Sequence, residues 1–398
     1  MIKLSQRAQQ MKPSATLGMA AKAKKLKAEG VDVISFAVGE PDFDTPLHIR
    51  EAGKKGIDEG LTRYTPSNGI PELRIAVREK LKRENNLSYS DEEIVVTCGA
   101  KQAIYNALQV IVDPGDEVIV PAPYWVSYPD QVLLAAGRPV ILATSEADSF
   151  RVKPDKLAGA ITPRTRAVIL NYPSNPTGSS YSAEEIRQLG EVIADRKIAV
   201  ISDEVYEKLL YTGERHTSIA EACPRCKEYT IVVNGVSKSY AMTGWRMGYA
   251  AGPRDVISKI AEITGQQNTG IPGFVQKACV EAIRGPQDEV ERMRQEFKAR
   301  RDLMLEALAS IRGMRCHVPD GAFYLLPGVE AWIGKSWNGN RIPDADTLAE
   351  YLLEEAHVAT VGGDPFGAPG FLRLSYATSR QKIEEGVARL SKALSRLA

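Results

Sequence analysis

We predict an α/β fold with a large and a small domain for this chain from three features of its sequence. Short runs rich in β-branched residues alternate with helical stretches through the middle of the chain, which is typical of a mostly parallel sheet covered by helices. A chain of 398 residues is too long for one compact core. The two ends follow a different pattern, with long helices and few strands, and indicate a smaller α+β domain.

Six apolar runs of strand length lie in the middle of the chain, and helical periodicity fills the stretches between them. Runs this apolar predict strands that are buried on both faces of a sheet. The expected helices include residues 101–112 and 183–194. The expected strands span residues 93–99, 116–123, 166–173, 197–204, 229–235 and 246–252.

The two ends of the chain define the predicted domains. Gly30 is expected to end the N-terminal helix, because glycine readily adopts the left-handed backbone conformation found after helices. We assign residues 46–287 to a large α/β domain, and residues 1–45 together with 288–398 to a small α+β domain with an N-terminal arm. The elements expected in the two ends are helices over 18–29, 290–311 and 379–397 and a strand over 371–377.

Charge and composition exclude several classes of protein. Lys and Arg number 51 against 50 Asp and Glu, so the chain lacks the basic surplus typical of nucleic-acid-binding proteins. No apolar run approaches the ~18 residues that a membrane span needs, and the first residues lack the apolar core of a signal peptide. Five cysteines fit a reducing compartment. We therefore expect a cytoplasmic protein that binds neither nucleic acid nor membrane.

Cysteine and histidine spacing predicts no metal site. Cys223 and Cys226 form a CPRC motif, but no second CxxC and no histidine cluster completes a zinc site. We interpret both thiols as surface residues, with a redox or metal-binding role as the less favoured alternative. The four histidines are scattered along the chain, and His216 is expected to be exposed in its loop.

Polar residues follow several predicted strands, at the edge where α/β folds bind ligands. Lys238 lies in a turn of small residues shortly after an apolar run. Desolvation there would lower the pKa of the lysine and make its amine nucleophilic, as Schiff-base formation with an aldehyde requires. The alternative is an ordinary solvated lysine in a loop.

Three further residues at this edge would suit an aromatic cofactor. Asp203 ends the most apolar run, where a protonated pyridine nitrogen would be a suitable partner for a buried carboxylate. Its alternative role is to cap a helix that begins at about Glu204. Tyr206 and Asn175 could hydrogen-bond a phenolate oxygen of the same ring, although Asn-Pro-Thr-Gly is also ordinary turn chemistry.

The start of the helix over 101–112 predicts a phosphate-binding site. Gly99 lets the backbone approach a ligand closely, and the free amides of Ala100 and Lys101 at a helix N-terminus favour an anion. Arg246 could add a bidentate contact. The chain contains neither GxxxxGK[ST] nor GxGxxG, so the usual nucleotide cradles are missing.

Arg373 lies between apolar residues in the strand expected over 371–377. A half-buried arginine requires an anion. Its planar fork could bind the carboxylate of an amino acid or keto acid. An internal salt bridge is an equally good explanation.

Taken together, these motifs resemble the class I aminotransferases of the fold-type I pyridoxal-phosphate enzymes. The resemblance covers essentially the whole chain and is nearest to the bacterial aspartate and aspartate/prephenate aminotransferases. It implies a mostly parallel seven-stranded sheet flanked by helices, pyridoxal 5'-phosphate as cofactor, and ping-pong transfer of an amino group between amino acids and 2-oxo acids. The motifs that carry it are MKPSAT, VGEPDFDTP, NYPSNPTG, ISDEVYEKLLY, VNGVSKSYAMTGWRMGYAAGP, GAFYLL and FLRLSYAT.

The resemblance implies a role for each residue that matches a family motif. Lys238 would bind the cofactor as a Schiff base and move the substrate proton, with Asp203 on the pyridine nitrogen and Tyr206 on the ring hydroxyl. Because Tyr64 reaches the phosphate across the subunit interface in such enzymes, a homodimer with two shared active sites is implied. The other implied cofactor contacts are Gly99, Ala100, Lys101, Trp125, Asn175, Ser237 and Arg246, and the implied substrate contacts are Gly39, Trp125, Asn175, Arg373, Thr16 and Lys101.

Two departures from the family affect this site. Many relatives carry a phosphate-binding serine three residues before the lysine, where this chain has Gly235, so that Ser237 or backbone amides would take over. The better-known aspartate enzymes bind the distal carboxylate with an arginine, but residues 264–276 contain neither Arg nor Lys. In the prephenate-accepting group a Thr and a Lys serve instead, and Thr16 and Lys101 occupy those places. This favours dicarboxylic substrates.

Other activities remain open at this point. A transaminase of neutral, aromatic or diaminopimelate substrates, or a C–S β-lyase, would share the same lysine and aspartate, because the fold does not set the reaction. Effector-sensing domains of some transcription regulators share the fold as well. The near-neutral charge and the start of the sequence within the aminotransferase arm disfavour that last class.

Overall fold

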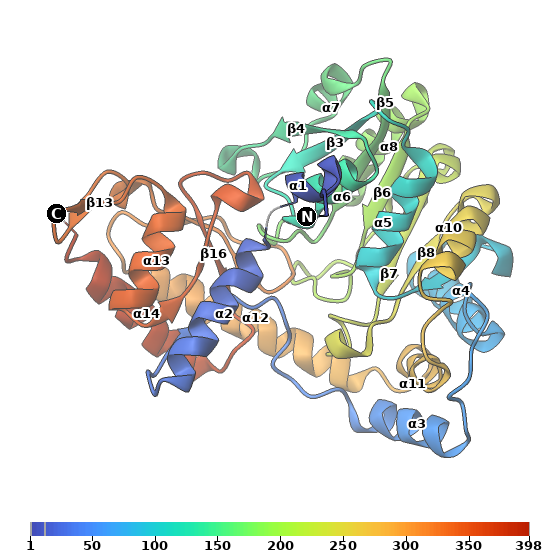
Figure 1. Ribbon diagram of the computed structural model, residues 1–398, viewed down its shortest axis with the longest axis horizontal. Helices are drawn as coiled ribbons and strands as arrows, with labels where there is room; N and C mark the ends of the chain where they lie inside the picture. The colour runs from blue at the N-terminus through green and yellow to red at the C-terminus, as the bar shows by residue number, and fades with distance from the viewer. Residues whose placement is uncertain (1, 12, 398) are drawn as a thin grey trace.

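A seven-stranded sheet forms the centre of the computed structural model, which describes residues 2–11 and 13–397 (Figure 1). The strand order is β2-β8-β7-β6-β5-β3-β4. Neighbouring strands are parallel, except that β8 is antiparallel to both β2 and β7. The predicted α/β class and the mostly parallel sheet are therefore confirmed. The strands are β2 (Ile94–Thr97), β3 (Glu117–Ala122), β4 (Arg138–Ala143), β5 (Thr165–Asn171), β6 (Ala199–Asp203), β7 (Thr230–Gly235) and β8 (Gly248–Ala251).

Six of these strands coincide, to within two residues at each end, with the apolar runs of the sequence. Strand β4 has no such run, because its residues are exposed or half-buried. Strand β2 lies at the other edge of the sheet, but helices cover it and bury all its residues, so it keeps an apolar sequence.

Helices cover both faces of the sheet because successive strand residues point to opposite sides. Ile169 and Ile201 pack against α5, α6 and α10, whereas Val168 and Val200 pack against α7, α8 and α9. Two more helices, α4 and α11, pack beside the β2–β8 edge. The helices of this body are α3 (Leu47–Asp58), α4 (Pro71–Asn85), α5 (Ala100–Ile111), α6 (Ser127–Leu134), α7 (Pro154–Ala160), α8 (Ala183–Arg196), α9 (Ile219–Ala222), α10 (Arg254–Gln267) and α11 (Gly273–Arg284).

The two ends of the chain meet in a second lobe, where helix α2 lies against the C-terminal helices (Figure 1). Strand β1 (Ile34–Ser35) pairs in parallel with β14 (Val358–Ala359), far away in the sequence. Strand β16 (Leu372–Ser375) is antiparallel to both β10 (Tyr324–Leu325) and β15 (Val361–Gly362). The domain boundaries at residues 46 and 287 stay a prediction. The remaining elements are α1 (Gln6–Gln10), α2 (Ala15–Ala28), α12 (Asp288–Ala309), α13 (Ala345–Glu355), α14 (Arg380–Leu394), β9 (Arg315–Cys316), β11 (Pro327–Gly328), β12 (Ser336–Trp337) and β13 (Asn340–Arg341).

The residue types at the ends of α2 and α12 explain where these helices end and begin. Gly30 follows α2 with a φ of +89°, as expected for the residue that ends a helix. Helix α12 begins two residues earlier than predicted, because the acidic side chains of Asp288 and Glu289 favour a helix N-terminus. Within the described part of the chain, no helix has the length and apolarity required to cross a membrane.

Three residues that we expected at the surface are buried. Cys223 packs behind α8, where a Cβ on Gly190 would meet the Cys223 Cβ at 2.5 Å. Cys226 lies in the same core, and burial raises the pKa of its thiol to about 12. Neither thiol is therefore a reactive surface group. His216 is also buried, because it hydrogen-bonds Glu204 and stacks on Tyr172 at a ring distance of 5.1 Å.

Candidate active site

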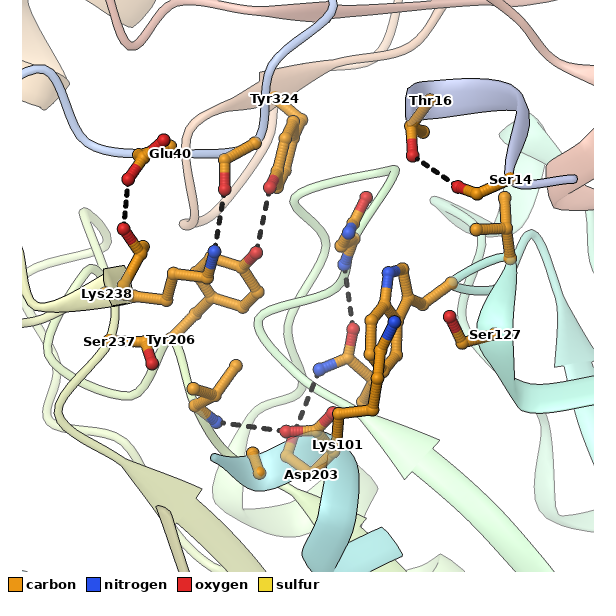
Figure 2. Close-up of a pocket in the computed structure, with 18 of the residues that line it drawn as sticks. Ser14, Thr16, Glu40, Lys101, Ser127, Asp203, Tyr206, Ser237, Lys238 and Tyr324 are labelled. Atoms are coloured by element: carbon orange, nitrogen blue, oxygen red, sulfur yellow. Dashed lines mark hydrogen bonds between the residues drawn. The ribbon is translucent and has the colours of Figure 1, made fainter. Parts of the chain in front are cut away.

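A cavity of about 420 Å³ lies at the carboxyl ends of the central strands and is closed on its other side by residues of the second lobe (Figure 2). Such a volume fits a cofactor together with a small substrate. It contains nearly all the residues that the sequence singled out. The predicted residues that line it are Thr16, Gly39, Ala100, Lys101, Trp125, Asn175, Asp203, Tyr206, Ser237, Lys238, Arg246 and Arg373.

Two predicted residues do not line the cavity. Gly99 lies directly beside it, because a Cβ there would meet Arg246 Nη2 at 2.5 Å, and its φ of +77° also favours glycine. Tyr64 is 94% exposed and lies outside the cavity of its own chain. A role for Tyr64 therefore requires a second subunit.

Lys238 reaches into the cavity from the turn that follows β7. Its Nζ donates to the carbonyl oxygen of Gly39 at 2.7 Å and lies 5.8 Å from the centre of the Tyr206 ring. Burial lowers the pKa of Lys238 to about 8; Glu40 opposes this shift and the positive charge of Arg373 adds to it. About a tenth of the amine is therefore unprotonated at pH 7, far more than for an ordinary lysine, and this fraction can act as a nucleophile. The alternative of a solvated loop lysine is wrong.

Asp203 is a buried carboxylate at the end of β6. Tyr128 donates its hydroxyl to Asp203 Oδ2 at 2.7 Å, and the chain continues in turns rather than in a helix. The helix-capping alternative is therefore wrong. Burial raises the pKa of Asp203 to about 6, although the Tyr128 hydrogen bond opposes the shift. The carboxylate makes no ion pair with any described residue, so a cationic group in the cavity would stabilise it.

Asp203 makes the stability of the cofactor-free protein depend on pH. Because its pKa is raised by folding, the folded state holds the proton more tightly, and stability falls as the pH rises from about 4 through about 6. A rise from 3.8 to about 6 corresponds to a cost of about 3 kcal/mol above pH 6. We expect Asp203→Asn to be more stable than the wild type at pH 7.5, with a difference that disappears near pH 4.

Urea unfolding of both cofactor-free proteins across this pH range measures that difference. Asp155→Asn, at the start of α7, is a control that should not be more stable than the wild type at pH 7.5, because an acidic side chain favours a helix N-terminus. A wild type that is as stable as Asp203→Asn at pH 7.5 would contradict the prediction.

Arg373 is fully buried rather than half-buried, with 2% of its surface exposed. Its Nη1 donates to Asn175 Oδ1 at 3.1 Å and its Nη2 to the carbonyl oxygen of Ala37 at 2.6 Å, while its Nε has no partner. No carboxylate of the described residues forms an ion pair with it, so the salt-bridge alternative is wrong. Burial lowers the pKa of Arg373. An uncompensated buried guanidinium at a cavity is a binding site for a carboxylate.

The start of α5 forms the phosphate-sized end of the cavity. Ala100 is the first helical residue, so its amide and that of Lys101 lack helical acceptors. Arg246 closes this end, with Nη1 on the carbonyl oxygen of Thr243 at 2.9 Å. Gly248 allows the close approach, since a Cβ there would meet the Ala100 amide nitrogen at 2.3 Å. A Cβ on Gly235 would likewise meet the Met247 carbonyl oxygen at 2.7 Å, which explains why this position lacks a serine.

Several cavity residues carried no distinct signal in the sequence. Tyr324 hydrogen-bonds Tyr206 between the two hydroxyls at 2.9 Å, and Glu40 accepts a hydrogen bond from Thr243. Tyr324 belongs to the motif GAFYLL and Tyr128 follows Trp125 by three residues, but local sequence does not show which tyrosine of such a stretch reaches a cavity. At the outer wall, Ser14 and Thr16 share a hydrogen bond of 2.9 Å at the start of α2, and Lys101 Nζ lies 4.7 Å from the centre of the Trp125 ring.

The fold and this cavity define an enzyme of the α/β class that uses a lysine amine, a buried carboxylate and an anion-binding arginine. Residues 31–390 match the family of class I and class II aminotransferases. The chain belongs to this family.

Relatives extend over the whole chain. The aspartate aminotransferase of Geobacillus stearothermophilus is 48% identical over 98% of both proteins. The aspartate/prephenate aminotransferase of Nitrosomonas europaea is 45% identical over 99% of this chain and 100% of its own length. The crystal structure of the Rhizobium meliloti aspartate aminotransferase superposes with a TM-score of 0.96 at 44% identity, covering 100% of both chains. The structure of the Thermus thermophilus enzyme with maleate gives a TM-score of 0.93 at 44% identity, over 99% of this chain and 100% of that one.

Proposed function

We propose that this chain is a pyridoxal-phosphate-dependent aminotransferase that acts on aspartate or glutamate and on the matching 2-oxo acids, with prephenate as a further acceptor. One observation carries the proposal. Lys238, Asp203 and Arg373 reach one cavity. Burial lowers the pKa of the lysine, the carboxylate has no ion-pair partner among the described residues, and the arginine Nε has no hydrogen-bond partner there, so the cofactor and the substrate would supply what these groups lack.

The residues present fit this cofactor. The glycine-lined start of α5 and Arg246 offer amides and a positive charge to a phosphate, without side-chain obstruction from Gly248. Asp203 offers a carboxylate to a ring nitrogen, and Asn175, Tyr206, Trp125 and Ser237 line the space between. When bound, pyridoxal phosphate supplies an aldehyde for Schiff-base formation and a ring that stabilises negative charge next to it.

The protein's own groups would carry out the remaining steps. Lys238 is the covalent attachment point, and its displaced amine is the base that takes the proton from the substrate Cα. Asp203, kept anionic by a cationic partner, holds a proton on the ring nitrogen. Tyr206 and Asn175 orient the ring hydroxyl. Arg373 and the backbone at Gly39 hold the substrate α-carboxylate, so that the Cα–H bond faces the Lys238 amine.

A second carboxylate of the substrate would bind at the outer wall of the cavity. Thr16 and Lys101 line this wall, at the places that the resemblance to the prephenate-accepting group assigns to them. Burial and the charge of Arg246 both lower the pKa of Lys101, although the charge of Asp130 opposes the shift. A dicarboxylic substrate would place a second carboxylate beside this ammonium.

Replacing Lys101 by methionine is expected to change substrate preference. Loss of one charged hydrogen bond should lower kcat/KM for aspartate by about tenfold to a hundredfold, because such bonds contribute roughly 1.5–3 kcal/mol. The value for alanine should change much less, and the aspartate-to-alanine ratio is the measurement. Lys22→Met, an exposed lysine of α2, is the control. If kcat/KM falls equally for aspartate and alanine, Lys101 contacts only the cofactor phosphate and not the second carboxylate of the substrate.

We further propose a homodimer in which the partner subunit's Tyr64 completes the phosphate site. Its exposure here supports this arrangement, as do the exposed apolar side chains of Leu47, Ile57 and Leu61 on and after α3. Sedimentation of the wild type tests the dimer, and a monomer that retains full activity would overturn it.

The absorbance spectrum of the purified protein tests the proposed function. We expect a visible band with pyridoxal phosphate that disappears on addition of aspartate or glutamate and returns with oxaloacetate or prephenate. If only alanine or aromatic amino acids remove the band, the protein is still an aminotransferase, but the proposed preference for aspartate and glutamate is wrong. Release of pyruvate and ammonia from cystathionine would identify a C–S β-lyase instead. The absence of a visible band after addition of pyridoxal phosphate would contradict the proposal that this protein binds that cofactor.

A further inference from the structure

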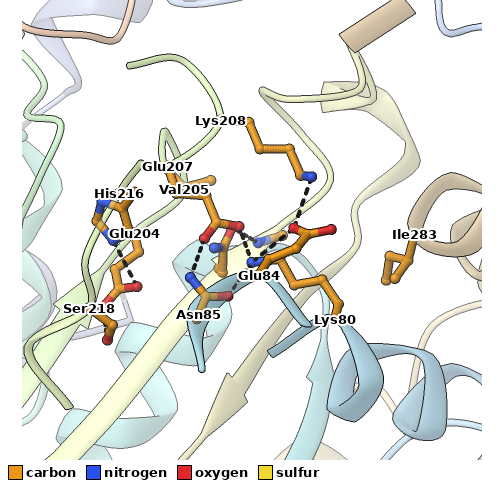
Figure 3. A network of polar contacts seen from close by, with 12 residues as sticks. Lys80, Glu84, Asn85, Glu204, Val205, Glu207, Lys208, His216, Ser218 and Ile283 are labelled. Carbon is orange, nitrogen blue, oxygen red and sulfur yellow. Dashed lines mark hydrogen bonds and ion pairs between the residues drawn. The ribbon is translucent and has the colours of Figure 1, made fainter. Parts of the chain in front are cut away.

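A buried polar cluster surrounds Glu204 and Glu207 (Figure 3). These two glutamates belong to the same segment as Asp203 and Tyr206. In this segment, Asp203 and Tyr206 line the cavity, whereas Glu204 and Glu207 do not. Both glutamates instead reach the buried cluster, where 0% of Glu204 and 8% of Glu207 is exposed. The same short stretch of backbone therefore connects the cavity with the cluster. The cluster consists of Lys80, Asn85, Glu204, Glu207, His216 and Ser218.

Two side chains of helix α4 donate hydrogen bonds to Glu207. Lys80 donates to Glu207 Oε1, and Asn85 donates to Glu207 Oε2 at 2.8 Å. Lys80 also donates to Asn85 Oδ1 at 2.7 Å, so the three side chains form a closed ring of contacts. Although burial opposes it, the Lys80 charge and its neighbours lower the pKa of Glu207 to about 2. Glu207 is therefore a buried anion with one well-defined position.

Glu204 is held from the opposite side by the loop before α9. Ser218 donates its hydroxyl to Glu204 Oε1 at 2.7 Å, and His216 Nε2 lies 3.0 Å from Glu204 Oε2. The His216 ring stacks on Tyr172, which fixes its orientation. Two carboxylates on one short segment are thus anchored in different directions, and a segment held at two such points cannot rotate about its own axis.

The cluster does not suit a metal ion. One ligand atom from each of Glu204, Glu207 and His216 lies within 4.8 Å of the others, which is close enough for a shared cation. The Lys80 ammonium already provides the positive charge, and the carboxylate oxygens already accept hydrogen bonds. A divalent ion would be placed beside an ammonium at an energetic cost.

We propose that Glu204 and Glu207 are positioning residues for the cofactor: anchored by Lys80, Asn85 and His216, they hold Asp203 and Tyr206 in the orientation that the ring requires. The inference rests on the proposed function, because the oriented groups are those assigned to the ring nitrogen and hydroxyl. It explains why the chain keeps costly buried charges on the segment that carries Asp203, a carboxylate whose pKa burial raises to about 6.

The test compares two buried glutamates that differ in their distance from the cavity. Glu117 is also fully buried and bound by Arg138 and Arg164, but it lies at the amino end of β3. Glu207→Gln leaves the Lys80 ammonium buried beside a neutral group, whereas the arginines bound to Glu117 are more than half exposed, so Glu207→Gln should lower Tm more than Glu117→Gln does. At a temperature at which both are folded, Glu207→Gln should raise the Kd for pyridoxal phosphate by about tenfold or more and shift the maximum of the bound cofactor band. Glu117→Gln should leave both unchanged.

A triple variant separates the positioning role from stability. Lys80→Met with Asn85→Leu and Glu207→Leu replaces the whole ring of contacts by apolar side chains of similar size, which often keeps a protein stable and leaves no buried amide unpaired. We expect a Tm near that of the wild type with the weakened cofactor affinity retained. Wild-type affinity and spectrum in this folded variant, or equal weakening in Glu117→Gln, would overturn the positioning role. A wild type without a cofactor band would overturn the proposed function itself, and the inference with it.

Discussion

Replacing Lys238 by alanine is expected to lower kcat by on the order of 10⁴-fold or more while leaving the fold intact. Two contributions are lost together: the covalent attachment of the cofactor and the base that removes the Cα proton. The nearest other cationic groups on the cavity wall are arginines and Lys101, and none hydrogen-bonds the Gly39 carbonyl oxygen as Lys238 does. Single-turnover measurement with aspartate and bound pyridoxal phosphate gives the rate of proton transfer directly.

The Tm of Lys238→Ala shows whether activity is lost because the amine is missing or because the protein unfolds. Burial lowers the pKa of Lys238, so the protein gains rather than loses stability when the desolvated amine is removed. We therefore expect an unchanged or slightly higher Tm for the cofactor-free Lys238→Ala protein. Lys238→Arg keeps a charge but offers no nucleophilic amine at neutral pH, and it should be equally inactive. Lys153→Ala, a half-exposed lysine before α7, should retain full activity. Turnover of Lys238→Ala within tenfold of the wild type would contradict the mechanism.

Arg373→Met is expected to lower kcat/KM for aspartate by on the order of a hundredfold to a thousandfold, since truncating one partner of a buried charge pair costs about 2–5 kcal/mol. The substrate α-carboxylate would lose the only guanidinium of the cavity that already spans Asn175 and the Ala37 carbonyl oxygen. Arg373→Lys should recover little of this, because an ammonium does not reproduce the planar fork. Initial rates over a range of aspartate concentrations measure the effect.

The same substitution should not destabilise the free protein. In the described residues, Arg373 is buried without a carboxylate partner and with an unsatisfied Nε, so its removal relieves a desolvation cost. A Tm that is unchanged or raised, together with the loss of stabilisation by aspartate, would show that function and stability conflict at this residue. Arg389→Met removes an arginine paired with Asp32 and Glu385 at the surface and is the control. Aspartate binding by Arg373→Met with wild-type affinity would place the carboxylate site elsewhere.

Much of this arrangement could be predicted from local sequence. The central strands are buried on both faces, so their apolar runs stand out, and the polar residues that follow them necessarily gather at one edge of a parallel sheet. Asp203 and Lys238 were found in this way. Arg373 was found because a cation among apolar strand residues is unusual.

Local sequence was less informative where burial depends on neighbours that are distant in the chain. The edge strand β4 lacks an apolar run, and Cys223, Cys226 and His216 looked like surface residues until their packing partners were known. Tyr128 was found only through its contact with Asp203, 75 positions further along the chain.

The sequence by itself determined the α/β class, the central strands and the identity of the chemical groups, because each depends on residue type and on spacing within a single element. The tertiary structure alone decided which groups are unsatisfied. Among the described residues, Arg373 lacks a counter-ion, Asp203 has Tyr128 as its only side-chain hydrogen-bond donor, and Glu207 is held by Lys80. These facts depend on which side chains of distant segments meet. Charge balance in a low-dielectric interior is a property of the assembled neighbourhood and not of any segment within it.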